Sequence, residues 1–205
     1  FGGSSREREV SFSGGRTVYD NLDKSVFEAV PIFVDSFNQL ILLDWSYIYK
    51  GSIRDFYPPI EYLPASPHAY QIYADSLAES LSPEEKQRMG NAVGKVISPS
   101  DLTSLIDIAF LALHGFAGED GSIQGLLEWY GIPYTGSGLF ASAFGIDKSI
   151  QKKLFSAINM PTPAFTIIEK QDWLKDEKSC TDGLKKNVGF PCVIKAANQG
   201  SSIGI

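Results

Sequence analysis

Two glutamates follow a pair of glycines near the start of the sequence, in the order Gly2-Gly3, Glu7 and Glu9. Glycines let the backbone approach a ligand closely, and a helix that opens just after them presents free N–H groups to an anion such as a carboxylate. The glutamates would then hold an ammonium group beside that anion, so the segment is a candidate site for a small zwitterion. The same residues also fit a capping box, Ser4-x-x-Glu7, and the segment alone favours that structural interpretation.

Three further positions combine a polar side chain with a strand end or a helix start. His114 follows an apolar run, Lys148 lies in the first turn of an expected helix, and Lys195 ends an expected strand. A lysine at the positive end of a helix dipole is unfavourable, which indicates an anion near Lys148. Each residue also has a structural interpretation, the histidine as a hydrogen-bonded loop former and the lysines as solvated surface charges.

The last candidate is the loop from Gly200 to Gly204, which contains Ser201 and Ser202. Backbone amides of a glycine loop, together with two hydroxyls, can surround phosphate oxygens without adding charge. By itself the loop is more typical of a polar hairpin turn. It matches neither the dinucleotide-binding glycine fingerprint nor the Walker loop, in which the lysine follows the glycines.

The elements that must position these residues alternate between strand and helix patterns, which indicates an α/β fold. Ser82-Pro83-Glu84-Glu85 is a strong helix start, and the apolar run 105–113 predicts a central parallel strand buried on both faces. The proline- and tyrosine-rich segment 45–66 is expected to be an ordered surface loop. The expected strands are 29–34, 39–44, 105–113, 164–168 and 191–195, and the expected helices are 10–22, 83–93, 120–130, 148–158 and 171–186.

Composition excludes several classes of protein. The chain of 205 residues has 18 Lys and Arg against 24 Asp and Glu, a net charge of −6, so it lacks a broad basic surface for a nucleic-acid backbone. Its apolar runs are far shorter than the roughly 18 residues that cross a membrane, and no secretion signal begins the sequence, which predicts a cytoplasmic protein. Cys180 and Cys192 have neither disulfide nor metal-ligand spacing.

Taken in order, these pieces resemble the D-alanine–D-alanine ligases of the ATP-grasp superfamily. The resemblance spans the whole chain, and the block from His114 to Gly138 is the part most specific to that family. The matching segments are Gly2–Ser11, Leu113-His114-Gly115, Gly118–Gly125, Pro133–Gly138, Asp147-Lys148 and Lys195 with Gly200–Gly204.

The resemblance implies a fold and a reaction. A Rossmann-like pre-ATP-grasp domain would cover residues 1–143, and the first part of an ATP-grasp domain would cover residues 144–205. Ligases of this family use ATP and Mg²⁺ (or Mn²⁺) to phosphorylate the carboxylate of one D-alanine. The amine of a second D-alanine then attacks the acyl phosphate, and the dipeptide enters peptidoglycan synthesis. A homodimer built on the first domain also fits the resemblance.

The resemblance further implies roles for the candidate residues near the first substrate. Glu7 would hold the ammonium of the first D-alanine, in a subsite shaped by the turn that ends at Val10, and this replaces the capping-box interpretation. His114 would lie beside the same amino acid.

The remaining candidates would bind the nucleotide. Lys148 and Lys195 would contact the phosphates and reduce the repulsion between ATP and a carboxylate nucleophile. Gly200, Ser201 and Ser202 would close over the γ-phosphate, with Ser201 linking that loop to Glu7.

The sequence also departs from the family pattern. Ala196 follows the strand lysine where the family usually has proline, and this change in loop stiffness is expected to be tolerated. The family's metal-binding carboxylates and the loop that selects the second substrate would follow Ile205, so no metal ligand is assigned in this chain, which is expected to be inactive alone. D-Lactate or D-serine as second substrate, and a non-catalytic nucleotide-binding module, stay open as alternatives.

Overall fold

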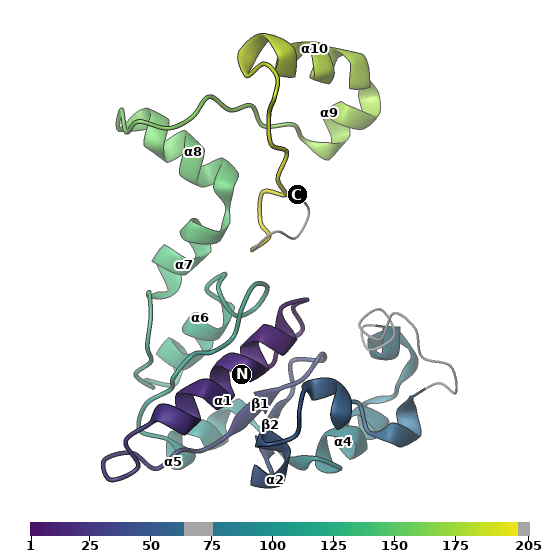
Figure 1. Ribbon diagram of the computed structural model, residues 1–205, viewed down its shortest axis with the longest axis vertical. Coiled ribbons are helices and arrows are strands. Elements are labelled where there is room, and N and C mark those ends of the chain that lie inside the picture. The colour runs from purple at the N-terminus through teal and green to yellow at the C-terminus, as the bar shows by residue number, and fades with distance from the viewer. Residues whose placement is uncertain (64–75, 201–205) are drawn as a thin grey trace. The chain divides into compact units, whose positions relative to one another are not determined.

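The structure is a computed structural model that describes residues 1–63 and 76–200 (Figure 1). The chain forms two compact units, Phe1–Ala143 and Phe144–Ile205. The first unit contains a three-stranded antiparallel sheet with helices on both faces, which confirms the α/β class. Among the described residues, no helix combines the length and the apolar character that crossing a bilayer requires.

The sheet consists of β1 (Ile32–Val34), β2 (Leu40–Leu43) and β3 (Gly94–Ile97), in the order β1-β2-β3. Phe33 pairs with Ile41, and Leu42 pairs with Lys95. The first two strands confirm the predictions for 29–34 and 39–44 and are shorter than expected. The third strand was not predicted, because Gly94 and Lys95 dilute a run of only four residues.

The first residues of the chain lie parallel to β1. Val34 N donates to Phe1 O at 2.8 Å, and Gly3 N donates to Val34 O at 2.7 Å. Gly2 has φ +97°, and a Cβ there would lie 2.4 Å from Val34 O, so this close pairing requires glycine.

Helix α1 (Arg8–Asn21) follows this turn and confirms the expected N-terminal helix. Its apolar residues Val10 and Phe12 differ in burial. Phe12 is 2% exposed, whereas Val10 is 58% exposed. Arg8 and Ser11 are buried instead, because this side of the helix contacts polar loops at its start.

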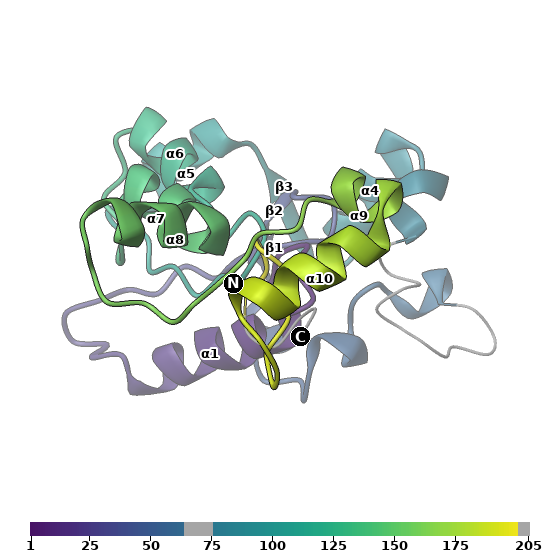
Figure 2. The same ribbon diagram turned by 90° about the horizontal axis from the view of Figure 1, so that it is seen from above.

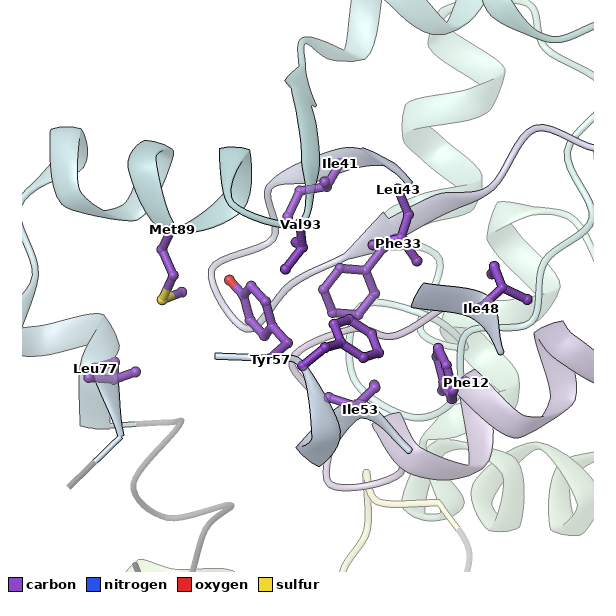
Figure 3. Packing of buried hydrophobic residues seen from close by; sticks show 11 residues of the cluster. Phe12, Phe33, Ile41, Leu43, Ile48, Ile53, Tyr57, Leu77, Met89 and Val93 are labelled. Carbon is purple, nitrogen blue, oxygen red and sulfur yellow. The ribbon is translucent and has the colours of Figure 1, made fainter. Parts of the chain in front are cut away.

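The alternation of side chains along the strands gives the sheet two apolar faces. Phe33, Ile41 and Leu43 face a cluster formed with α1, α2 (Trp45–Ile48), the 3-10 turn η1 (Ile53–Asp55) and α4 (Pro83–Asn91). In Figure 3 the side chains of Phe12, Phe33 and Tyr57 gather in this cluster, and the Phe33 and Tyr57 rings are 5.1 Å apart, edge to face.

The opposite face of the sheet is covered by α5 (Leu102–Leu105) and α6 (Ser122–Trp129). Val34, Leu40 and Ile97 pack there against Leu102 and Leu127. Figure 2 shows α1 on one side of β1 and β2, and α5 and α6 on the other side. The sheet is therefore the central layer of three.

Two expectations for this unit are wrong. The segment 105–113 is not a strand buried on both faces, since it forms one parallel bridge, Ala109 with Tyr134, and exposes half or more of Ile108 and Phe110. Within the described part of the first unit, Ala109 and Leu111 pack against the core, and Ile108 and Phe110 do not. The segment 45–66 is not simply a surface loop: its described part contains α2, η1 and η2 (Ile60–Tyr62) and places Ile53, Phe56 and Tyr57 in the core.

The sequence predicts the helices of this unit more accurately than its strands. The Ser82 hydroxyl accepts from Glu85 N at 3.2 Å and the Glu85 carboxylate accepts from Ser82 N at 2.8 Å, so the predicted capping box starts α4. Helix α6 confirms the helix expected over 120–130, and Gly131 ends it with φ +68°. The 3-10 turn η3 (Pro99–Asp101) was not predicted.

The described part of the second unit is helical. Asp147 caps α8 (Lys148–Ala157) as predicted, and the helix expected over 171–186 is broken at Asp176 into α9 (Lys170–Lys175) and α10 (Glu177–Asn187). Helix α7 (Leu139–Ile146) spans the boundary of the two units and was not predicted. The strands predicted over 164–168 and 191–195 are wrong: both segments lack strand pairing, and a strand needs a neighbour to hydrogen-bond with.

Candidate functional site

The turn before α1 is not a capping box. The Ser4 hydroxyl donates to Asn38 Oδ1 at 3.2 Å, and helix α1 begins after Glu7 without a side-chain cap. Glu7 N instead donates to the Ser5 hydroxyl at 3.1 Å. The Glu7 carboxylate is therefore not used to start the helix.

One oxygen of that carboxylate, Glu7 Oε2, is buried and accepts no hydrogen bond from the described residues. The loop after His114 approaches this oxygen closely: a Cβ placed on Gly115 would lie 3.1 Å from Glu7 Oε2 and 2.5 Å from Ser5 Oγ. Gly115 also has φ +66°, so both its conformation and its surroundings require glycine. The sequence segments of Glu7 and His114 thus meet at one place.

Glu9, the other glutamate of the segment, has a different environment. Its Oε1 lies 3.2 Å from Arg54 Nε, and its Oε2 accepts from Ile53 N at 3.3 Å. These contacts attach α1 to η1. Of the two glutamates proposed to hold an ammonium, Glu7 carries the free buried acceptor, and Glu9 has partners within the fold.

The loop of His114 is fixed by its own polar residues. Gly115 N donates to Glu119 Oε2 at 2.8 Å, and His114 Nδ1 lies 3.6 Å from Glu119 Oε1. His114 is 38% exposed, so it lies at the rim of the site rather than inside the core. The sequence places Glu119 within the motif that follows His114. Its position five residues after the histidine is the signal that could have indicated this contact.

Asp120 stabilises the same loop from within. It accepts from Ala117 N at 2.8 Å and from Ser122 N at 3.0 Å. Burial raises the pKa of Asp120, but these hydrogen bonds to the charged form outweigh burial, so the net pKa lies below its usual value. Gln124 adds a bond from Nε2 to Gly118 O at 2.9 Å. The loop is therefore preorganised.

The turn between β1 and β2 contacts the segment around Glu7, and the sequence analysis did not predict this contact. Ser36 accepts from Arg8 Nη1, and Asn38 accepts from Ser4. Asp35, which is fully buried, shapes the turn by accepting from Phe37 N and Gln39 N, both at 2.8 Å. An aspartate followed by a polar turn between two strands was a local signal for this arrangement.

In the second unit, Lys148 contacts the segment that follows Lys195. Lys148 N donates to Ala197 O at 2.9 Å, and Lys148 Nζ donates to Gln199 O at 2.5 Å. The carboxylate of Asp147 accepts from Ser149 N at 2.8 Å at the same helix end. This carboxylate offsets the positive helix end, so the position of Lys148 alone does not require an external anion.

Other candidate residues have less defined surroundings. Lys195 is exposed, and Gly200 is the last described residue. Ser201 and Ser202 lie outside the described residues, so the structure does not address their expected role. Val10 lies three residues after Glu7 on α1 and is mostly exposed. The described ranges contain no group of three His, Cys, Asp or Glu side chains arranged to hold a metal ion.

The first unit thus combines an α/β fold with a buried, unpaired carboxylate oxygen where the segments of Glu7 and His114 meet. The family model described as D-ala D-ala ligase N-terminus matches residues 1–137, and the model described as D-ala D-ala ligase C-terminus matches residues 154–205. The chain belongs to the D-alanine–D-alanine ligase family.

Similar proteins agree with this assignment. The chain is 35% identical, over its whole length, to the D-alanine–D-alanine ligase of Geobacillus kaustophilus, and covers 51% of that protein. A ligase of the same name from Mycobacterium avium is 33% identical over the whole chain, with 51% covered. The chain thus spans about half the length of the curated relatives that it matches.

Solved structures show the same fold. The D-alanine-D-alanine ligase from Coxiella burnetii matches with a TM-score of 0.63 and 21% identity, over 99% of this chain and 53% of that one. The VanG D-Ala:D-Ser ligase from Enterococcus faecalis matches with a TM-score of 0.62 and 21% identity, over 99% and 52%. The two likenesses are equally strong, so the fold does not distinguish between the named substrates of these two ligases.

Proposed function

We propose that the whole protein joins two D-alanine molecules to D-alanyl-D-alanine, with ATP and through an acyl phosphate, for peptidoglycan synthesis. The observation that carries the proposal is the unpaired buried oxygen of Glu7 beside the loop of His114. A buried acceptor without a donor costs free energy unless a ligand supplies the donor. An ammonium group supplies both a donor and an opposite charge.

In this proposal the first D-alanine lies between the two loops. Glu7 binds its ammonium group, and Val10 belongs to the wall of the same subsite. Glu119 lies on the Nδ1 side of His114, at 3.6 Å, and Nε2 is the atom proposed to contact the carboxylate of the amino acid. The fixed loop holds this carboxylate where it can attack a phosphoryl group, so the protein contributes mainly orientation.

The second unit would contact the nucleotide. Lys148, Lys195, Gly200, Ser201 and Ser202 are the proposed phosphate-binding residues, and the contact of Lys148 with Gln199 supports a shared site for the lysine and the glycine loop. The positive charges reduce the repulsion between ATP and the attacking carboxylate. Mg²⁺ or Mn²⁺ enters the proposal through the family resemblance, since the described residues offer no cluster of metal ligands.

The domain assignment is part of the same proposal. Residues 1–143 would be the pre-ATP-grasp domain, and residues 144–205 the first part of the ATP-grasp domain. The two compact units and the two family models support this division. A cytoplasmic location, where ATP is available, and a homodimer through the first domain complete the proposal.

The test is phosphate release by the complete gene product with ATP, Mg²⁺ and D-alanine. We expect phosphate and D-alanyl-D-alanine in equal amounts, and no phosphate release with L-alanine. Product analysis with added D-lactate or D-serine identifies a different second substrate. Nucleotide binding without any ligation would favour the non-catalytic module and overturn the proposal.

A further inference from the structure

Ser11 is a fully buried polar residue on α1 that links three separate segments. Its hydroxyl donates to Ala112 O at 2.6 Å and accepts from Gly2 N at 2.7 Å. Its own N–H donates to Glu7 O at 2.9 Å, as the helix requires. The Ser11 side chain therefore contacts the glycine turn and the segment that leads to His114, and its backbone N–H contacts Glu7, the residue before α1.

The spacing along the chain makes these contacts relevant to the substrate site. Ser11 lies one helical turn after Glu7, and Ala112 lies two residues before His114. Both connections are short, so the hydroxyl lies close along the chain to each of the two proposed substrate-binding residues. Glu7 and His114 are 107 positions apart in sequence, and the Ser11–Ala112 hydrogen bond joins their segments.

The described segments of Glu7 and His114 are not paired with each other through their backbones. Phe1–Gly3 pairs with β1, whereas Ala109 pairs with the segment Pro133–Thr135. The two loops thus belong to different ladders. Contact between them comes from side chains: the Ser11 hydroxyl bonds to Ala112 O, Leu113 lies against Gly3, and the side chains of Ser5 and Glu7 lie against Gly115.

We propose that Ser11 is a positioning residue that sets the separation of Glu7 and His114 in the first D-alanine subsite. This inference rests on the proposed function. Without the hydroxyl, the Gly2 N–H and the Ala112 carbonyl lose their shared partner in a buried place, and the loops move to satisfy them. Displacement of binding groups by about 1 Å is enough to lower a rate about 100-fold.

The test compares Ser11→Ala with two control variants in the complete gene product. Ser13→Ala removes an exposed hydroxyl from the same helix. Phe12→Leu reduces packing at a core residue that is 2% exposed, and so lowers stability without removing the hydroxyl link. Michaelis constants for D-alanine and ATP are measured together with the melting temperature of each variant.

We expect Ser11→Ala to raise the Michaelis constant for D-alanine about tenfold or more, with that for ATP unchanged. Ser13→Ala should match the wild type, and Phe12→Leu should lower the melting temperature with a much smaller change in the D-alanine constant. Ser11→Cys replaces the hydroxyl by a larger thiol that bonds only weakly, so it should resemble Ser11→Ala. It provides the same comparison if Ser11→Ala does not fold.

Two results overturn different statements. If the wild type does not ligate D-alanine, the proposed function fails. If the wild type is active and the Ser11 variants change the D-alanine constant no more than Phe12→Leu does at equal loss of stability, then Ser11 only supports the fold and the positioning role is refuted.

Discussion

Replacing Glu7 by glutamine separates the proposed binding role of this residue from its structural role. The substitution keeps the shape of the side chain and removes its charge. In the structure Glu7 Oε2 is buried without a hydrogen-bond partner among the described residues, and Glu7 does not cap α1 by its side chain. Loss of the charge should therefore leave the melting temperature unchanged or raise it, because burying an unpaired carboxylate oxygen is unfavourable.

The same substitution should weaken the binding of the substrate. A hydrogen bond to a charged group contributes about 1.5–3 kcal/mol, and each 1.4 kcal/mol corresponds to a factor of ten. The Michaelis constant for the first D-alanine should then rise about 10- to 100-fold, while that for ATP stays close to the wild-type value. Few substitutions are expected to weaken substrate binding and at the same time preserve or increase the stability of the protein.

The assay is phosphate release at varied D-alanine with saturating ATP, accompanied by thermal unfolding. Glu9→Gln is the matched control, because Glu9 is two residues away and contacts Arg54 and Ile53 N. It should cost a little stability and leave the D-alanine constant unchanged. An unaltered constant for Glu7→Gln, or equal effects of the two variants, would refute the assignment of Glu7 to the ammonium group.

Three further predictions concern other parts of the chain. Lys195→Ala should raise the dissociation constant for ATP without changing the melting temperature, and an unchanged constant by calorimetry would show a surface lysine. Ser82→Ala removes one half of the capping box of α4 and should cost about 1 kcal/mol in urea unfolding, with no loss if the box is unimportant. Burial raises the pKa of Asp35 above its usual value, despite hydrogen bonds from Gln39, Tyr57 and Phe37, so the folded state binds this proton more tightly than the unfolded state. The stabilisation from Asp35 should be complete below its unfolded pKa and decrease as pH rises through its folded pKa. A free-energy difference from Asp35→Asn that is independent of pH would contradict this.

Local signals explain what the sequence predicted well. The Ser82 capping box and the Asp147 cap involve residues within three positions of each other, so their geometry depends little on the rest of the chain. Strand predictions were wrong where the strand would need a neighbouring segment to pair with. The run 105–113 is apolar enough for a buried strand, but Ile108 and Phe110 are exposed in the part of the chain that the structure describes. The apolar character of a segment indicates that it packs in the core, but it does not identify the segment against which it packs.

The candidate site shows the same division. Glu7 and His114 were singled out from their residue types and neighbours, and the structure brings their loops together at Gly115. Glu7 and Glu9 looked equivalent in sequence, and only the three-dimensional contact of Glu9 with Arg54 distinguishes them. The link through Ser11 was invisible for the same reason, since its acceptor lies 101 residues away.

The distance of 101 residues between Ser11 and Ala112 also orders events during synthesis of the chain. The ribosome releases the glycine turn, α1 and the first two strands long before residue 112 emerges. The hairpin of β1 and β2 closes a short loop, which costs little entropy, whereas the link to Ala112 closes a long one. The growing chain therefore contains Glu7 before the loop of Gly115 has been synthesised. The proposed site for the amino acid is therefore complete only after translation has passed Gly115.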